Sequence, residues 1–112
     1  MNKGISTHVL DTALGKPAEG VAIVLEARDS TGWKVLAHGV TDGEGRVAAL
    51  LPGGPPSTND YRIRFATGVY FASLGQSVFY PEVVIHVHLE AHAKYHLPLL
   101  LSPFGYSTYR GS

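Results

Sequence analysis

The chain of 112 residues is 45% hydrophobic, 16% charged and free of cysteine, which suits a single domain over residues 1–112 and excludes a disulfide framework or a thiolate nucleophile. Nine basic side chains balance nine acidic ones, and without a basic cluster we expect no nucleic-acid partner. No apolar stretch approaches the about 20 residues of a membrane helix, and residues 1–5 carry no apolar leader, so we expect a cytoplasmic protein without membrane contact.

Short β-rich segments alternate with turns rich in Gly, Pro, Asn and Asp, which is typical of a β-sandwich or barrel. About eight strands are expected in the whole chain. Residues 13–18 should form a loop, because Gly15 and Pro17 interrupt any periodic element there. Residues 29–32 and 42–45 have the composition of tight turns. In the first half of the chain, strands are expected at 5–11, 21–27, 33–41 and 46–50.

The second half begins with a clearer pattern. Residues 61–65 alternate large apolar side chains with basic ones, which predicts a strand with one buried and one exposed face. From Thr67 to Gly75 the apolar spacing becomes helical, with Thr67 suited to the N-cap and Gly75 to the left-handed position after the last turn. We therefore expect one short helix in this part of the chain.

Two long strands should follow the helix. Residues 82–89 alternate apolar and polar side chains, whereas residues 95–102 are apolar on both faces. In a two-sheet sandwich only one face of each sheet belongs to the core, so the second apolar face of this strand should be buried against another subunit. We expect a subunit interface at His96, Pro98 and Leu100.

Two of the six histidines, His8 in the strand expected at 5–11 and His96 in the strand at 95–102, are candidates for chemistry. His8 shares a strand face with Ser6 and Leu10, and His96 belongs to the expected interface face. Both imidazoles should therefore lie on one oligomer-facing surface. They are either functional groups or ordinary interface histidines that hydrogen-bond to the backbone.

A second histidine group is a weaker candidate for chemistry. His86 and His88 lie about 7 Å apart on one strand face, and His92 follows, but no carboxylate stands at a matching spacing. A solvent-exposed face explains this group better than a zinc site, so no metal site is expected. The sequence also lacks a Gly-x-Ser-x-Gly elbow, a phosphate-binding loop and a His-Glu-x-x-His helix, which leaves direct attack by an oriented water as the available hydrolytic chemistry.

Three segments carry a family resemblance: ISTHVLD at 5–11, YHLPLLLSP at 95–103 and GYSTYRGS at 105–112. Together they resemble the transthyretin-related 5-hydroxyisourate hydrolases, and the similarity spans nearly the whole chain. The resemblance implies an all-β fold, a transthyretin-like two-sheet β-sandwich with one short helix. It also implies a homotetramer, built as a dimer of dimers, in which two facing sheets enclose a channel.

The same resemblance implies an activity. The expected reaction is hydrolysis of 5-hydroxyisourate to 2-oxo-4-hydroxy-4-carboxy-5-ureidoimidazoline in urate breakdown, with no cofactor. In the hydrolase family the matching residues line a pocket between subunits; here they are His8, Arg46, His96, Tyr109 and Ser112.

The resemblance, taken with the chemistry of these groups, implies a role for each. One of His8 and His96 is the general base on water, and the other is its orienter or the proton donor to the leaving nitrogen; the sequence leaves the choice open. Arg46 would hold the flat, carbonyl-rich ring with its fork of donors and stabilise negative charge. Tyr109 would contact the substrate, and Ser112 would complete the pocket through its hydroxyl or the terminal carboxylate.

Ordinary structural interpretations stand beside these roles. Arg46 alone is typical of a solvated charge next to a turn, Tyr109 of a packing residue, and Ser112 of a frayed end. Lys94 departs from the resemblance, because family members often have an acidic residue or a histidine there, which puts the pH dependence in question. The alternative functions are a small-molecule carrier of the transthyretin type and a purely structural subunit.

Overall fold

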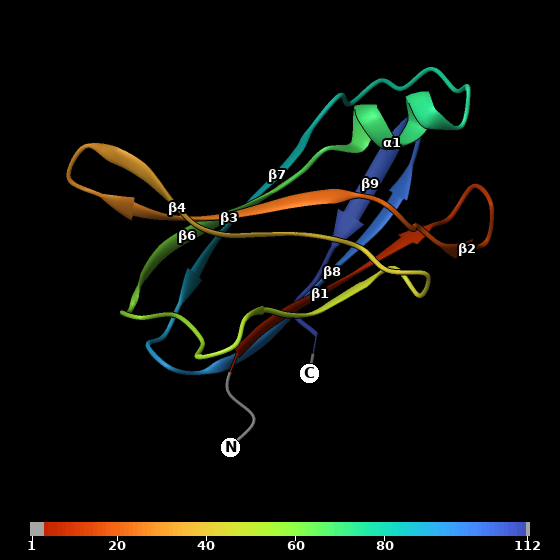
Figure 1. Cartoon of the computed structure of the whole chain (residues 1–112). Coiled ribbons are helices and arrows are strands. Elements are labelled where there is room, and N and C mark those ends of the chain that lie inside the picture. Colours follow the sequence, from red (N-terminus) through yellow and green to blue (C-terminus); the bar gives the residue numbers. More distant parts are fainter. Residues whose placement is uncertain (1–3, 112) are drawn as a thin grey trace.

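Two β-sheets pack face to face around an apolar core, and one short helix covers an end of the sandwich (Figure 1). The structure is a computed structural model and describes residues 4–111. Within this range the chain forms nine strands and one helix, in agreement with the expected all-β sandwich of about eight strands. The elements are β1 (Gly4–Asp11), β2 (Lys16–Pro17), β3 (Ala22–Asp29), β4 (Gly32–Val40), β5 (Arg46–Leu51), β6 (Asn59–Phe65), α1 (Thr67–Ser73), β7 (Val83–Leu89), β8 (Lys94–Ser102) and β9 (Gly105–Thr108).

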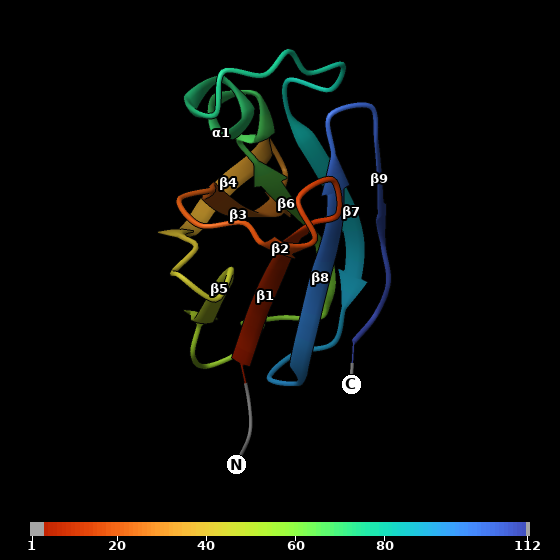
Figure 2. The ribbon, with the colours of Figure 1, turned by 90° about the vertical axis from the view of Figure 1, so that its right-hand side faces the viewer.

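The two sheets differ in how they join distant parts of the chain. The second sheet has the order β4-β3-β6-β7 and is antiparallel throughout. The first sheet has the order β2-β1-β8-β9, with β5 also paired to β1. Figure 2 shows β5, β1, β8 and β9 side by side. The β1–β8 pair is parallel, so the first and last long strands of the chain are direct neighbours.

The core forms where the apolar alternation of the strands predicts it. On β6, Tyr61, Ile63 and Phe65 are fully buried, while Arg62 and Arg64 between them are part-exposed. On β7 the expected inward residues are buried or half-buried and the outward ones are exposed. The large apolar side chains from both sheets therefore share one interior.

Two local expectations were wrong in detail. Residues 13–18 are not only a loop, because Lys16 and Pro17 form the short strand β2 along the end of β1. Thr67 does not cap the helix: the N-cap is Ala66, without a side-chain cap, and the Thr67 hydroxyl donates to the Tyr80 carbonyl oxygen at 2.8 Å. Tertiary contact with the segment before β7 thus takes the hydroxyl that a local capping bond would use.

The other end of the helix follows the sequence expectation. Gly75 has a φ of 72°, and its N–H donates to the carbonyl oxygen of Ala72. The N–H of Gln76 donates to the carbonyl oxygen of Phe71. This is a Schellman motif, which ends the helix cleanly. Within residues 4–111 no helix has the length and apolar character to span a membrane.

One buried carboxylate fastens the helix to the first sheet. Asp11, at the end of β1, is 1% exposed and accepts the Tyr70 hydroxyl at 2.7 Å. Its other oxygen accepts the backbone N–H groups of Ala13 and Leu14. Burial and the adjacent carboxylate raise the pKa of Tyr70, so the phenol stays a hydrogen-bond donor. Asp11 therefore has a structural role, since it links α1 to the end of β1.

Replacing Asp11 with alanine is expected to lower the free energy of unfolding by about 3 kcal/mol, because three donors lose their partner and the Tyr70 hydroxyl is left buried. Tyr70→Phe removes only the phenol bond and should cost about 1 kcal/mol. Urea unfolding followed by circular dichroism measures both values. An Asp11→Ala protein as stable as the wild type would contradict this role.

Candidate active site

Strand β1 brings three of the five expected site residues, His8, Arg46 and His96, together on the outer face of the first sheet. Its His8 lies directly opposite Arg46 on β5 and opposite Pro98 on β8. Two residues earlier, Ser6 lies opposite His96. Since opposed residues of paired strands project to the same face, the two imidazoles and the guanidinium share one surface. The sequence expectation that His8 and His96 lie on one face is confirmed.

The turn before β5 fixes Arg46 beside His8. Gly45 has a φ of 76°, and its carbonyl oxygen accepts the Val9 N–H at 2.7 Å. A Cβ at this position would collide with the Val9 carbonyl oxygen, so only glycine allows the close approach. The Asp42 carboxylate accepts the N–H groups of Glu44 and Arg46, which holds the pKa of Asp42 below its usual range. The turn is therefore tied both internally and to β1.

The two imidazoles are close without touching face to face. Their ring centroids are 6.5 Å apart with an interplanar angle of 41°. Nε2 of His8 is buried and has no hydrogen-bond partner, and it is the one such side-chain atom among residues 4–111. An unsatisfied buried polar group costs about 1–3 kcal/mol, so such atoms in folded proteins call for a specific explanation.

His96 is held on both sides of its ring. Its Nδ1 lies 2.8 Å from the Ser6 hydroxyl oxygen. Gly111 forms a β-bridge with His96 and donates its N–H to the His96 carbonyl oxygen at 2.8 Å. A Cβ on Gly111 would lie 2.7 Å from Cδ2 of the imidazole, which is closer than real Cβ contacts. The described end of the chain is thus packed against a candidate catalytic side chain.

Charge and burial both act on His96. Burial lowers its pKa from the ordinary value, and repulsion from His8 when protonated, from Arg46 and from Lys94 lowers it further. The imidazole is therefore neutral at pH 7 and can accept a proton. Lys94, the residue that departs from the family resemblance, contributes to this shift as a neighbouring cation.

The remaining site candidates are accessible. The Arg46 side chain is 50% exposed, and its only ion pair among residues 4–111 is a 3.9 Å contact to the still more exposed Glu44, which constrains it little. The register set by His96 and Gly111 continues from β9 and places Tyr109 on the same sheet face; Tyr109 is 59% exposed. Ser112 lies outside the described residues.

Arg110 belongs to a different environment. It alternates with Tyr109 along the chain, and its guanidinium lies 5.1 Å from the centroid of the Tyr95 ring. Tyr95 is buried, whereas Arg110 is exposed and lines an open cavity of about 290 Å³ beside β7 and β8. Of the two adjacent C-terminal side chains, only Tyr109 therefore faces the site.

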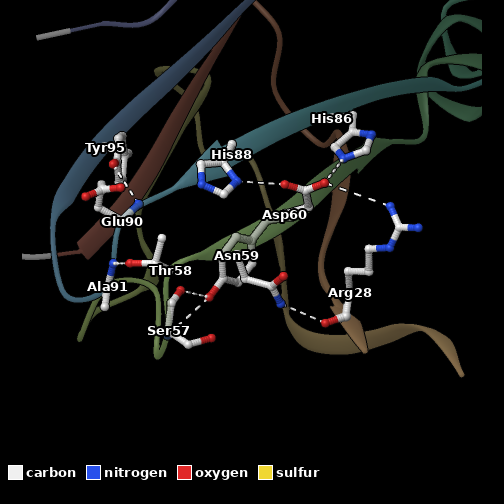
Figure 3. A network of polar contacts seen from close by, with 11 residues as sticks. Arg28, Ser57, Thr58, Asn59, Asp60, His86, His88, Glu90, Ala91 and Tyr95 are labelled. Atoms are coloured by element: carbon white, nitrogen blue, oxygen red, sulfur yellow. Dashed lines mark hydrogen bonds and ion pairs between the residues drawn. The ribbon is translucent and has the colours of Figure 1, made fainter. Parts of the chain in front are cut away.

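The second histidine group lies on the other sheet (Figure 3). Asp60 on β6 lies between His86 and His88 of β7. One of its carboxylate oxygens is 2.7 Å from His88 Nδ1, and the other is 3.1 Å from His86 Nε2. These contacts hold the pKa of Asp60 below its usual value. The sequence shows no carboxylate at a matching spacing, and the structure supplies one from the neighbouring strand β6. No group of three or more ligand residues suited to a metal ion occurs within residues 4–111.

Comparison with known proteins places the chain in a family. Residues 5–111 match the HIUase/Transthyretin family. The chain belongs to that family. It is 47% identical over 112 residues to 5-hydroxyisourate hydrolase of Salmonella dublin, an alignment that covers 99% of this chain and 82% of the relative. The solved structure of Klebsiella pneumoniae 5-hydroxyisourate hydrolase is similar with a TM-score of 0.84 and 37% identity, covering 96% of this chain and 98% of that one.

Fold similarity within the HIUase/transthyretin family does not separate its functions. Sea bream transthyretin in complex with thyroxine has a TM-score of 0.88 and 32% identity to this chain, and the match covers 96% of this chain and 93% of that one. One backbone therefore serves family members of both names. A distinction between a hydrolase and a carrier must therefore come from the side chains on the outer face of the first sheet.

Sequence reasoning missed two residues of the candidate site. Ser6 was noted only for sharing a face with His8, and Gly111 only as part of the C-terminal segment, yet both contact His96. The strand alternation that singled out His8 already placed Ser6 on the same face. Neither contact could be found without knowing which strands of the HIUase/transthyretin fold are paired.

Proposed function

We propose that this chain, as a single domain over residues 1–112, hydrolyses 5-hydroxyisourate to 2-oxo-4-hydroxy-4-carboxy-5-ureidoimidazoline in urate degradation. The observation that carries the proposal is the shared sheet face of His8, His96 and Arg46 in a member of the HIUase/transthyretin family. Relatives named 5-hydroxyisourate hydrolase occur in bacteria and in mouse. No cofactor takes part in the proposed reaction.

The proposed reaction is attack of water on a lactam carbonyl of the substrate. One imidazole takes a proton from water while the new carbon–oxygen bond forms. The carbon–nitrogen bond of the ring then breaks, and the leaving nitrogen takes up a proton from an imidazolium. Two imidazoles 6.5 Å apart suit this sequence, because both can reach one small ring and its attacking water.

Arg46 supplies the remaining electrostatic requirement. Negative charge develops on the attacked carbonyl oxygen, and a guanidinium offers fixed donors for it and for the neighbouring oxygens. The Arg46 side chain is half exposed on the site face and constrained by one long ion pair only among the described residues. Tyr109 is the proposed substrate contact at the rim, and Ser112 completes the proposed pocket.

The buried nitrogen of His8 supports a functional site over an ordinary interface histidine. A histidine that only fills space would use both ring nitrogens or leave one in water, whereas Nε2 of His8 is covered and unpaired. Proteins accept such costs mainly where chemistry or binding requires the group. A carrier of the transthyretin type would have no use for this arrangement, and it predicts binding without turnover.

The assembly is part of the same proposal. We propose a homotetramer, a dimer of dimers, in which the outer face of the first sheet is shared between subunits. Leu10 and Leu100 lie on that face and are only half-buried in one chain. Light scattering at micromolar concentration tests the assembly, and a fully active monomer would contradict the shared pocket. A cytoplasmic location is also proposed, and cell fractionation tests it.

The decisive experiment generates 5-hydroxyisourate freshly with urate oxidase and follows its ultraviolet decay with and without the protein. Faster decay with the wild type, and not with a His8→Asn/His96→Asn double variant, is the expected result. Prior treatment with EDTA should leave the rate unchanged, since no metal takes part in the proposed reaction. Equal decay with and without wild-type protein would overturn the proposal.

Gly111→Ala is expected to lower kcat by about tenfold to a hundredfold, because the added Cβ would press against Cδ2 of His96 and turn the ring. The thermal unfolding midpoint should change little, since Gly111 lies at the edge of the first sheet. Gly53→Ala is the matched control, because a Cβ at Gly53 meets no atom within 4 Å. Equal rates for the two variants would contradict a packing role of Gly111 in the site.

The lowered pKa of His96 sets the expected pH dependence. A base works only when deprotonated, so kcat/KM should be constant at neutral pH and fall on its acid side below the ordinary histidine pKa of about 6.5. Lys94→Glu replaces a nearby cation with an anion and should move that acid limb to higher pH, with Lys94→Gln in between. An acid limb that moves to lower pH in Lys94→Glu would contradict the assignment of the limb to His96.

A further inference from the structure

Ser6 makes the one hydrogen bond to the His96 ring that the described residues provide. We propose that Ser6 is a positioning residue: its oxygen accepts the Nδ1 proton of His96, which leaves Nε2 as the nitrogen that takes the proton from the attacking water. This inference rests on the proposed hydrolytic function. It also divides the work between the two histidines, with His96 as the general base and His8 in the partner role.

The geometry leaves one edge of the imidazole for chemistry. Nδ1 lies 2.8 Å from the Ser6 hydroxyl oxygen on β1. Cδ2 is covered by the backbone of Gly111, so close that a single added methyl group would overlap it. Among residues 4–111 no hydrogen bond reaches Nε2 of His96, so this is the ring nitrogen that remains available to take a proton.

The direction of the hydrogen bond decides the role of the ring. A serine hydroxyl can accept the proton of Nδ1–H or donate its own proton to an unprotonated Nδ1. If it donated, Nε2 would carry the ring proton and His96 could act only as a donor. If it accepts, the lone pair of Nε2 is available for water. The partner of one imidazole nitrogen thus sets the chemistry of the other.

Preorganisation favours the accepting arrangement. Once the base has taken a proton, both ring nitrogens carry hydrogen, and Nδ1 then needs an acceptor. A Ser6 oxygen that already accepts needs no rearrangement at that moment, whereas a donating hydroxyl would have to turn away. Among residues 4–111, the charged groups that act on the ring are His8 when protonated, from β1, Arg46 from β5 and Lys94 from β8, and all three are cations. The Ser6 oxygen is the acceptor that these residues provide for Nδ1.

A matched pair of variants tests this role. Ser6→Thr keeps the hydroxyl and Ser6→Val replaces it with a methyl group of similar shape, and both β-branched residues suit a strand. Ser6→Val should lower kcat by about tenfold to a hundredfold, the usual effect of losing such a partner, while Ser6→Thr stays near the wild type. Removing the acceptor destabilises the imidazolium, so the acid limb of the Ser6→Val profile should move to lower pH.

A spectroscopic measurement on the wild type needs no variant at Ser6. The ¹⁵N spectrum of the neutral histidines, with His96 assigned by loss of its signals in His96→Gln, should show Nδ1 protonated and Nε2 unprotonated. An unprotonated Nδ1, or a shift of the Ser6→Val limb to higher pH, would mean that the hydroxyl donates, and either would overturn the inference.

The two proposals fail in different ways. No turnover by the wild-type protein overturns the hydrolytic function and the catalytic role built on it. Turnover by the wild type, combined with a Ser6→Val variant whose rate and pH profile match the wild type, overturns only the role of Ser6. A folded Ser6→Val protein, checked by its near-ultraviolet circular dichroism, is the condition for this comparison.

Discussion

Replacement of His96 by asparagine is expected to lower kcat by about 10² to 10⁴-fold, the usual effect of losing a general base. Asparagine is smaller than histidine but keeps a hydrogen-bonding group near the Nδ1 position, so the contact with Ser6 can persist while proton acceptance is lost. His8→Asn should cause a loss in the same range if the second imidazole delivers the proton to the leaving nitrogen. Stopped-flow decay of fresh 5-hydroxyisourate measures both rates.

His88→Asn is the matched control for these variants. His88 is an exposed histidine on the second sheet that bonds Asp60 and does not share the face of His8. The same chemical change there should leave kcat within about twofold of the wild type, because the changes it makes are confined to a remote surface. Near wild-type turnover in His96→Asn, with an intact fold, would remove that residue from the mechanism.

The second large effect is expected at Arg46. Arg46→Lys keeps the positive charge but loses the planar fork of donors, so we expect kcat to fall by about 10² to 10³-fold, with a higher KM. The backbone of the turn should persist, because Asp42 bonds the N–H of residue 46 whatever its side chain. The initial rate at several concentrations of 5-hydroxyisourate separates the two parameters.

Two further variants isolate the guanidinium. Glu44→Gln removes the 3.9 Å ion pair to Arg46, and activity should stay near the wild type because exposed ion pairs contribute little. Arg28→Lys makes the same chemical change on the second sheet, beside Asp60, and should be silent in the assay. An Arg46→Lys enzyme with wild-type kcat and KM would show that charge alone suffices, and that the fork does not orient the ring.

Much of the fold could be predicted from local patterns. Alternation in 61–65 and 82–89 identified the inward faces correctly, and the turn at 42–45 and the end of the helix followed from their glycines. The short strand β2 could not be predicted, because a two-residue strand has no period of its own and exists only through its pairing with β1. The wrong N-cap has the same cause, a tertiary partner that local sequence does not reveal.

For the candidate site too, local sequence predicted the strand faces but not the pairing of the strands. Alternation placed His8 and His96 on the outer faces of their strands, but no local pattern says that these strands are neighbours. The pairing of Ser6 with His96 and of His8 with Arg46 depends on register across the sheet. The carboxylate beside His86 and His88 was missed for this reason too, since Asp60 precedes them by 26 and 28 positions.

The parallel pairing of β1 with β8 has a consequence for biosynthesis. Ser6 and His96 are 90 positions apart, so a ribosome must synthesise the chain as far as β8 before the first strand can meet its neighbour. Until then β1 has an unpaired edge on one side, and such edges are prone to association with other nascent or unfolded chains. Catalysis would therefore emerge at the final stage of folding, and turnover would report completed folding more directly than strand content does.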